Sequence, residues 1–132
     1  MTTEVSAVEE YMAKELVTVH PDTEAYEAIV LLLKYQISGM PVVDDSGKLV
    51  GMISERDCLK TLLDSKYHEF PTALVRDIMS LEPRTVDSTA SILEVAEVFL
   101  NNKFRRMPVV DDDHLVGQIS RRDVLRAIEE MH

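Results

Sequence analysis

The fold is decided by a stretch that occurs twice in the sequence. The first copy reads MPVVDD at residues 40–45 and LVGMISERD at residues 49–57; the second reads MPVVDD at residues 107–112 and LVGQISRRD at residues 115–123. Short apolar runs rich in β-branched residues are typical of strands, and the polar residues between the runs are typical of turns. Each copy therefore predicts a strand, a tight turn, a second strand and then a helix.

The repeat extends upstream of this motif. A shift of 67 residues gives 12 identities over residues 12–45, and a shift of 66 gives 8 over residues 49–60. A repeat that contains both strands and helices is not a helical array, so we expect an α+β fold. We place the two repeats at residues 1–66 and 67–132, with residues 66–72 as connector. Because halves of this size bury too little surface alone, they are expected to form one integrated pair.

Hydrophobic spacing predicts the elements around the motif. Short helices are expected over residues 8–14 and 73–79, and short strands over residues 16–20 and 84–86. A helix that starts at residues 21–22 is expected to face the core through a stripe at i, i+3, i+4 and i+7 spacing, namely Tyr26, Ile29, Val30 and Leu33.

The second copy predicts a matching helix. Ser91 and Glu94 have the spacing of a capping box at its start. Its core stripe is predicted to be Ile92, Val95, Ala96, Phe99 and Leu100, and a last helix is expected over residues 121–131. Pro41 and Pro108 have no backbone N–H, so we expect each at the start or the edge of a strand.

A tandem repeat of this length, with MPVVDD followed by G-x-I-S-x-x-D, resembles a pair of CBS (cystathionine-β-synthase) domains. The resemblance covers residues 8–128, nearly the whole chain. It implies two small β-sheets with packed helices, joined at a pseudo-twofold interface. It also implies clefts that hold an adenosine-containing ligand, with the ribose near the Ser-x-x-Asp motif.

Composition narrows the class of function. The net charge of −10 argues against general binding of nucleic acid or of anionic membranes, because both need a positive field. The sequence has no apolar run long enough to span a bilayer and no signal-peptide pattern at residues 1–5. One cysteine, Cys58, permits no intrachain disulfide, which fits a reducing cytoplasm.

No pattern points to catalysis or to a metal. The four histidines, His20, His68, His114 and His132, do not have the spacing of metal ligands, and no nucleophile and base are paired. We therefore expect a protein that is not an enzyme and that requires no cofactor. Cys58 follows Asp57 at a helix start, where a thiol pKa can fall, but a buried structural cysteine is the favoured interpretation.

The motifs Ser54-x-x-Asp57 and Ser120-x-x-Asp123 have two interpretations. Each can be a capping box, in which the serine and the acid satisfy backbone N–H groups at a helix start. Each can also bind ribose, because an ionised carboxylate accepts hydrogen bonds from two vicinal hydroxyls. Both copies follow Gly-x-Ile, where glycine lets another group approach the strand. The two roles can coexist.

Basic residues beside these motifs predict phosphate contact. Arg105 and Arg106 stand where the first copy has Ser38 and Gly39, so the two clefts are expected to differ. A guanidinium group offers a planar fork to phosphate oxygens. A pair of solvated arginines is the other interpretation. Further phosphate candidates are Arg56 and Arg122, which lie next to the acids.

The resemblance implies that each cleft mixes residues of both repeats. One cleft would combine Val17, Ile37, Ser38, Gly39 and Met40 with Arg105, Gln118, Ser120, Arg122 and Asp123. The other would combine Arg84, Phe104, Arg105, Arg106 and Met107 with Met52, Ser54, Arg56 and Asp57. Pro41 and Pro108 adjoin the two sets. Arg84 stands at the position equivalent to Val17, which is apolar in many members of the family. It would therefore either help to bind a phosphate or block the slot for adenine.

Two functions fit these residues. The favoured hypothesis is a regulatory module that senses AMP, ADP, ATP, NAD or S-adenosylmethionine and is read by an unidentified effector protein. The alternative is a structural dimerisation module with empty clefts. In both cases we predict a homodimer, built from the helices after Asp57 and Asp123 and those starting near Tyr26 and Ile92, because these helices carry more apolar positions than one pair can cover.

Overall fold

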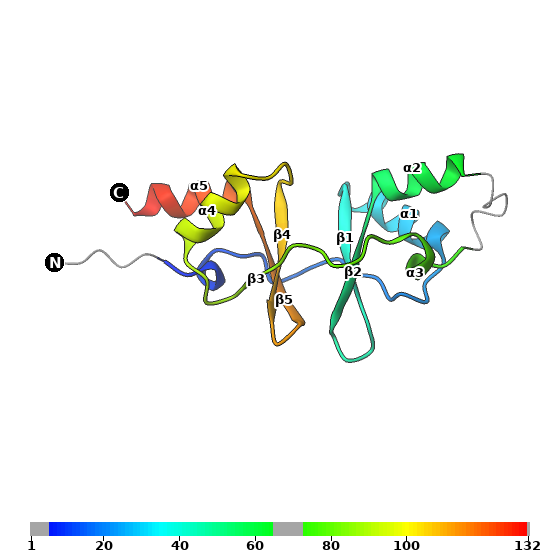
Figure 1. The fold of residues 1–132 in the computed structure, drawn as a ribbon, viewed down its shortest axis with the longest axis horizontal. Coiled ribbons are helices and arrows are strands. Elements are labelled where there is room, and N and C mark those ends of the chain that lie inside the picture. Colours follow the sequence, from blue (N-terminus) through cyan, green and yellow to red (C-terminus); the bar gives the residue numbers. More distant parts are fainter. Residues whose placement is uncertain (1–5, 65–72, 132) are drawn as a thin grey trace. The chain divides into compact units, whose positions relative to one another are not determined.

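The computed structural model describes residues 6–64 and 73–131. The predicted connector at residues 66–72 and the repeat boundary between residues 66 and 67 lie outside the described residues. The chain divides into two compact units (Figure 1). The N-unit is Val17–Pro83, and the C-unit is Met1–Leu16 together with Arg84–His132.

The N-unit is a two-stranded hairpin with helices packed on it. Its elements are α1 (Ala25–Lys34), β1 (Gly39–Val43), β2 (Leu49–Ser54), α2 (Glu55–Leu63) and α3 (Val75–Ile78). The antiparallel pair β1–β2 places Gly39 opposite Ser54. Isolated bridges flank the hairpin on both sides, a parallel one from Val19 to Val42 and an antiparallel one from Met52 to Ser80.

The C-unit repeats this architecture. Its elements are the 3-10 turn η1 (Val8–Glu10), β3 (Val86–Asp87), α4 (Ile92–Leu100), β4 (Arg106–Asp111), β5 (His114–Ser120) and α5 (Arg121–Glu130). The strand order is β3-β4-β5, with β3 parallel and β5 antiparallel to β4. An antiparallel bridge from Ala13 to Gln118 borders β5. The predicted α+β fold, two repeats with a small sheet and packed helices each, is confirmed.

The first segment of each repeat packs on the other repeat. Ala13 belongs to the first repeat but forms a bridge with Gln118 of the second. Ser80 belongs to the second repeat but forms a bridge with Met52 of the first. The compact units therefore do not follow the repeat boundaries in the sequence. The two segments align with one another in the repeat, so the alignment does not reveal that each joins the sheet of the other repeat. Only the tertiary structure shows this exchange.

The glycine of each second strand makes this exchange possible. A Cβ atom on Gly117 would lie 2.5 Å from Sδ of Met12 and 2.9 Å from the carbonyl oxygen of Ala13. On Gly51 it would lie 2.7 Å from Sδ of Met79 and 2.9 Å from the carbonyl oxygen of Ser80. The group that approaches each Gly-x-Ile strand is thus a methionine of the exchanged segment.

The hairpin turns use the residues expected from the sequence. Asp112 and Asp113 have φ values of 48° and 66°, the left-handed conformation that a two-residue hairpin turn requires. In the first turn Gly47 has φ 88°. The Asp44 carboxylate there accepts hydrogen bonds from the hydroxyl and N–H of Ser46, at 2.7 and 2.9 Å, and these bonds lower the pKa of Asp44.

Each unit has its own core. The core of the N-unit consists of Val19, Ala25, Ala28, Leu32, Met40, Val42, Ile53, Cys58 and Val75. The core of the C-unit consists of Val8, Ile92, Val95, Phe99, Met107, Val109, Ile119, Val124 and Ala127. The predicted burial of Ile92, Val95 and Phe99 is confirmed, but Leu100 is 85% exposed.

The predicted core face of α1 is wrong except at Ile29, which is half-buried and packs against the core. The buried stripe is Ala25, Ala28 and Leu32, whereas Tyr26, Val30 and Leu33 are exposed. The small alanines let the helix approach the hairpin closely, so the larger side chains remain on the outer face. The helix ends with Gln36 at φ 53°, and the N–H of Ile37 donates to the carbonyl of Leu32 at 3.0 Å.

Several boundaries differ from the sequence predictions. The helix predicted over residues 8–14 is only the three-residue turn η1, and the strand predicted over residues 16–20 is reduced to the single bridge at Val19. The helix predicted from residues 21–22 begins at Ala25. Ser91 caps α4 by accepting from the N–H of Leu93 at 3.1 Å rather than from Glu94.

The two prolines lie within strands and not at their starts. Pro41 is in β1, an edge strand of its two-stranded sheet, as predicted, whereas Pro108 is in β4, the central strand of its sheet. Pro41 is the third residue of β1, and Pro108 is the third residue of β4. The carbonyl of Pro41 accepts from the N–H of Val19 at 3.1 Å, on the side away from β2. A residue's N–H and C=O point to the same side of a strand, so the missing donor interrupts only the pairing with the short outer segment.

Candidate functional site

Both Ser-x-x-Asp motifs form capping boxes. In the N-unit, Oδ2 of Asp57 accepts from the N–H and the hydroxyl of Ser54, both at 2.9 Å, while the N–H of Asp57 donates to the Ser54 hydroxyl at 3.1 Å. In the C-unit, Ser120 and Asp123 make the same three bonds at 2.9, 2.9 and 3.2 Å. The structural interpretation of the motifs is therefore confirmed, and it engages one oxygen of each carboxylate.

The second oxygen of each carboxylate has a different partner in the two units. Oδ1 of Asp57 accepts from the hydroxyl of Ser80 at 3.1 Å. Oδ1 of Asp123 pairs with the guanidinium of Arg126 at 2.9 Å. Arg126 also donates to the carbonyl of Tyr11 at 3.2 Å and lies 5.7 Å from the centre of its ring. The acids thus differ in the charge of their neighbour.

Sequence reasoning missed Ser80 and Arg126. Arg126 follows Asp123 by three residues on a helix, a spacing at which side chains meet, so this ion pair was readable from the sequence. Ser80 lies 23 residues from Asp57 and reaches it only through the exchanged segment. The repeat alignment gave one sign that the two acids have different neighbours. Ser80 corresponds to Ala13 in the other copy, and alanine has no side-chain donor.

Within each unit, residues predicted for both clefts meet at one end of the hairpin. In the N-unit, Gly39 lies opposite Ser54, and the N–H of Glu55 donates to the carbonyl of Ser38 at 2.9 Å. In the C-unit, Arg106 lies opposite Ser120, and the N–H of Arg121 donates to the carbonyl of Arg105 at 3.0 Å. The first strand's start and the second helix's start therefore form one local surface.

The five arginines predicted to bind phosphate are all exposed. They are Arg56, Arg84, Arg105, Arg106 and Arg122. In the C-unit, a pocket of about 500 Å³ is lined by Ser120, Arg122, Asp123, Leu125, Arg126 and Glu129. Arg84 lies elsewhere, in a hollow that it shares with Glu94 and Glu97. Those two acids give Arg84 nearby negative charge, which makes it the weaker phosphate candidate.

The apolar candidates divide into buried and partly exposed residues. Met40, Pro41, Met107 and Pro108 are buried, and both methionines belong to the unit cores. Core packing therefore accounts for them without a ligand. The partly exposed apolar candidates are Val17, Ile37, Met52 and Phe104, and the polar Gln118 is partly exposed as well. Phe104 packs edge-on against Phe99, with ring centres 6.1 Å apart.

Other candidate chemistry is weaker in the described part of the chain. Cys58 is buried, and desolvation together with the charges of Asp57 and Glu55 raises its thiol pKa, so the structural interpretation holds. Residues 6–64 and 73–131 contain no group of three His, Cys, Asp or Glu residues placed to hold a metal ion. None of the helices in these two ranges is long and apolar enough to cross a membrane.

Comparison with known proteins assigns the family. The family model for the CBS domain matches residues 8–64 and 75–130. A curated relative, inosine-5'-monophosphate dehydrogenase of Methanocaldococcus jannaschii, is 37% identical over 123 residues, which are 92% of this chain and 23% of the relative. The chain therefore spans about a quarter of that enzyme.

Solved structures match over nearly the whole chain. A structure of CBSX2, a CBS-pair protein from Arabidopsis thaliana, in complex with AMP has a TM-score of 0.83 at 33% identity, covering 95% of this chain and 97% of that one. The CBS domain pair of protein MJ0100, in complex with 5'-methylthioadenosine and S-adenosyl-L-methionine, has a TM-score of 0.78 at 28% identity and covers 98% of this chain and 100% of that one. The two matched repeats and these alignments show that the chain belongs to the CBS domain family and carries two CBS domains in tandem.

Proposed function

We propose that the protein is a regulatory module that binds an adenosine-containing ligand at the Ser-x-x-Asp end of each unit. One observation carries the proposal: two solved relatives with the same tandem fold hold AMP in one case and methylthioadenosine with S-adenosylmethionine in the other. These ligands share adenosine and differ in what is attached to its 5' carbon. The shared part is therefore the chemistry that this chain is proposed to recognise.

The residues of this chain suit adenosine. Asp57 and Asp123 each use Oδ2 in a capping box, which leaves lone pairs on Oδ1 for a ribose hydroxyl beside Ser80 or Arg126. Exposed arginines adjoin both acids and supply counter-charge for a phosphate or a carboxylate. The assignment of all candidate residues to two mixed clefts stays a prediction.

A regulatory role follows from binding that favours one conformation. A ligand shifts an equilibrium only by the difference between its affinities for the two states, so the readout requires a partner that recognises one of them. We therefore propose an effector protein as partner and no catalytic step. We also propose a location in the cytoplasm, because a single, buried cysteine, Cys58, forms no intrachain disulfide and suits a reducing compartment.

A ligand panel tests the proposal. Thermal unfolding is measured with AMP, ADP, ATP, NAD and S-adenosylmethionine, and a binder at 100 times its Kd is expected to add about 2.7 kcal/mol to stability. Calorimetry then compares adenosine with 2'-deoxyadenosine for the native protein and for Asp57→Asn and Asp123→Asn. Loss of the 2'-hydroxyl is expected to lower the affinity of the native protein about tenfold. The Asn variant of the acid that binds the ribose is expected to lose little further affinity.

The controls separate folding from binding. Asn also caps helices, so each substitution is expected to cost at most about 1 kcal/mol of stability without ligand. If no adenosine compound raises the unfolding temperature, the protein is the structural module with empty clefts. If both Asn variants bind as tightly as the native protein, the ribose contact lies elsewhere.

A further inference from the structure

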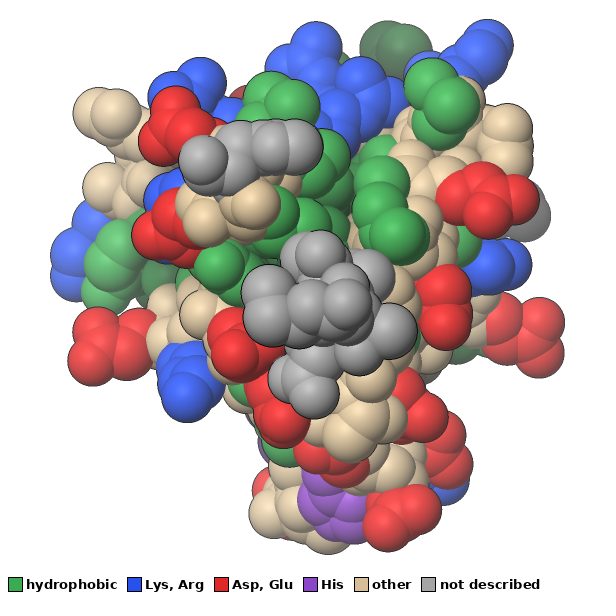
Figure 2. Space-filling view, turned by 90° about the vertical axis from the view of Figure 1, so that its left-hand side faces the viewer, with side chains coloured by type: hydrophobic (Ala, Val, Ile, Leu, Met, Phe, Trp, Pro, Cys, Tyr) green, Lys and Arg blue, Asp and Glu red, His purple; other side chains and the backbone are tan. Residues whose placement is uncertain are grey.

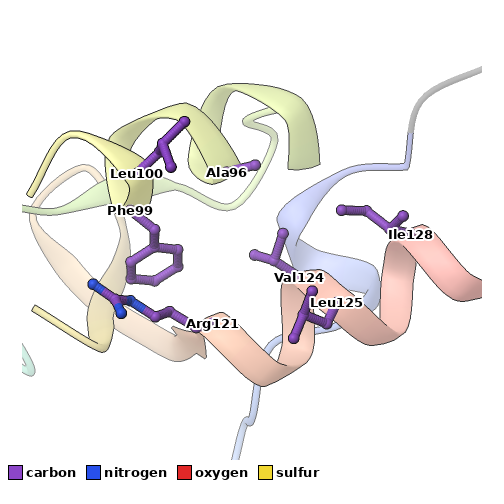
Figure 3. A pocket seen from close by; sticks show the side chains of 7 residues that line it. All are labelled: Ala96, Phe99, Leu100, Arg121, Val124, Leu125 and Ile128. Carbon is purple, nitrogen blue, oxygen red and sulfur yellow. The ribbon is translucent and has the colours of Figure 1, made fainter.

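Each unit holds a segment that belongs, by sequence, to the other repeat. The first segment, residues 6–13, lies on the C-unit, and the second segment, residues 73–80, lies on the N-unit. Figure 3 shows the ribbon of the first segment, in faint blue, beside α5 near Val124 and Ile128. Because the two segments are equivalent in the repeat, each unit needs a means of recognising its own.

The backbone contacts of the two segments are the same. The N–H of Val8 donates to the carbonyl of Ala90 at 2.8 Å, and the equivalent N–H of Val75 donates to the carbonyl of Thr23 at 2.8 Å. Each segment also forms its antiparallel bridge to a hairpin strand with two hydrogen bonds of 2.8 to 3.0 Å. The backbone therefore does not distinguish one segment from the other.

The apolar contacts of the two segments are also the same. Val8 and Val75 are each completely buried in the core of the unit that holds them. Met12 and Met79 each pack over the glycine of the neighbouring hairpin strand. Since valine and methionine stand at equivalent positions in both segments, exchanging the segments would leave these contacts unchanged.

The charged side chains, in contrast, differ between the segments. On the N-unit, Arg76 of the second segment forms an ion pair with Asp22. The equivalent residue of the first segment is Glu9. If the first segment lay on the N-unit, Glu9 would stand beside Asp22, and an attraction between opposite charges would become a repulsion between two acids.

Acidic side chains are abundant in this protein, so such a repulsion matters. Figure 2 shows many Asp and Glu side chains on the face in view, and the net charge of the chain is −10. On the C-unit, the residue equivalent to Asp22 is the neutral Thr89. The repulsion that Asp22 would cause is therefore absent at the position that Glu9 occupies.

A second difference concerns the carboxylate of Asp57. The hydroxyl of Ser80, in the second segment, donates to Oδ1 of Asp57 at 3.1 Å. The equivalent residue of the first segment is Ala13, which has no side-chain donor. Only the second segment can therefore make this hydrogen bond on the N-unit.

A third difference lies on the C-unit. The guanidinium of Arg126 donates to the carbonyl of Tyr11 at 3.2 Å and lies 5.7 Å from the centre of its ring. The Tyr11 hydroxyl forms a hydrogen bond with Glu130, which raises the pKa of Tyr11. The equivalent residue of the second segment is Ile78, which has neither an aromatic ring nor a hydroxyl. The second segment would therefore lose both side-chain contacts on the C-unit.

We propose that these polar side chains recognise the segments and select the exchanged placement over a direct placement, in which each segment would lie on its own repeat. Each contact is weak alone, since its groups are partly or largely exposed, so the selection rests on their sum. The exchanged placement also supplies Ser80 to Asp57 and Tyr11 to Arg126. The selection needs no ligand, so its failure leaves the proposed binding of adenosine untouched.

A competition between two disulfides measures the placement. Ala13→Cys, Gln118→Cys and Met52→Cys are combined in one chain, with Cys58→Ala to remove the native thiol. The Cα atoms of a hydrogen-bonded antiparallel pair lie about 5.5 Å apart, a distance that a disulfide spans. A disulfide between positions 13 and 118 reports the exchanged placement, and one between positions 13 and 52 reports the direct placement. Peptide mapping after equilibration in glutathione buffer gives their ratio, counting only disulfides within one chain.

Transposing the polar side chains tests what sets this ratio. The first segment receives Glu9→Arg and Tyr11→Ile, and the second segment receives Arg76→Glu, Ile78→Tyr and Ser80→Ala. Without the transposition, the disulfide between positions 13 and 118 is expected to dominate. With it, the proportion of the disulfide between positions 13 and 52 is expected to rise about tenfold or more.

The matched control transposes an exposed pair outside the three contacts, Lys14→Leu with Leu81→Lys, and is expected to leave the ratio unchanged. A ratio that the full transposition does not change, in chains that circular dichroism shows to be folded, overturns the proposal and assigns the placement to the chain connections. An equal shift in the control overturns it as well. If the full transposition does not fold, Glu9→Arg with Arg76→Glu alone decides: the proportion is expected to rise about threefold, and an unchanged ratio overturns the proposal.

Discussion

The hydroxyl of Ser80 donates a hydrogen bond to Oδ1 of Asp57 at 3.1 Å, across 23 residues of sequence. The equivalent oxygen of Asp123 accepts instead from the charged Arg126 at 2.9 Å. A neutral hydrogen bond contributes about 1 kcal/mol. The Arg126 side chain is 54% exposed, so solvent screens its charge and the ion pair by itself contributes about 0–1 kcal/mol. Arg126 is also held by the Tyr11 carbonyl and ring, whereas Ser80 has the single bond to Asp57, so we expect a ligand hydroxyl to displace Ser80 more easily than Arg126.

We predict that the two acids contribute unequally to adenosine binding. Asp57→Asn is expected to lose about tenfold in affinity, and Asp123→Asn less, because Arg126 competes for its carboxylate. Arg126→Ala frees Oδ1 of Asp123 and is expected to enlarge the effect of Asp123→Asn. Calorimetry with adenosine on the native protein, the two single variants Asp123→Asn and Arg126→Ala, and their double variant measures this coupling. Ser80→Ala serves as the matched change in the N-unit. Equal losses for both acids would contradict the prediction.

Gly117→Ala and Gly51→Ala are predicted to destabilise the protein by about 1–3 kcal/mol, the usual cost of overpacking. The new Cβ atoms would meet methionine sulfur and a backbone carbonyl oxygen at 2.9 Å, and the carbonyl cannot move away alone. Urea denaturation measures the loss. Met12→Ala in the Gly117→Ala background is expected to rescue only part of it.

A third glycine supplies the control for this pair. A Cβ atom on Gly39 would lie 3.2 Å from the carbonyl oxygen of Ile53, a contact that a small shift relieves. Gly39→Ala is therefore expected to cost less than either of the other two. A loss as large as theirs would show that chain stiffness, and not the close approach of Met12 and Met79, governs these positions.

We predict that Cys58 reacts slowly with iodoacetamide. Desolvation raises the thiol pKa above its ordinary value, and the charges of Asp57 and Glu55 raise it further, so the thiolate is scarce at pH 8. Because folding raises this pKa, its contribution to stability is complete below the pKa of the unfolded thiol and is lost as the pH rises through the folded value. The alkylation rate in buffer and in urea measures the difference, and equal rates would show that the thiol is accessible.

Arg105 and Arg106 are predicted to bind phosphate. Reversing both to Glu is expected to weaken AMP far more than adenosine, since only AMP carries the charge that a guanidinium recognises. The matched control is Lys103→Glu, an exposed charge reversal two residues upstream. Calorimetry that shows equal losses for AMP and adenosine would remove the phosphate role of the two arginines.

The sequence by itself determined the features that depend on neighbours along the chain. The hairpins follow from MPVV and LVG-x-I with polar turns between them, and the capping boxes of Ser54 and Ser120 follow from a three-residue spacing. These features need only local geometry, so the repeat predicted both copies alike. The family and the α+β fold class followed from the same motifs.

Tertiary structure decided which surfaces meet. Periodicity predicted a core face of α1 that includes Tyr26 and Leu33, but both are exposed. The small Ala25 and Ala28 are buried instead, because they admit close packing. The exchange of the segments around Ala13 and Ser80 pairs residues far apart in the sequence, and no local pattern encodes such a pairing. That exchange alone brings Ser80 to Asp57, and it makes two acids that are identical in sequence motif different in their chemistry.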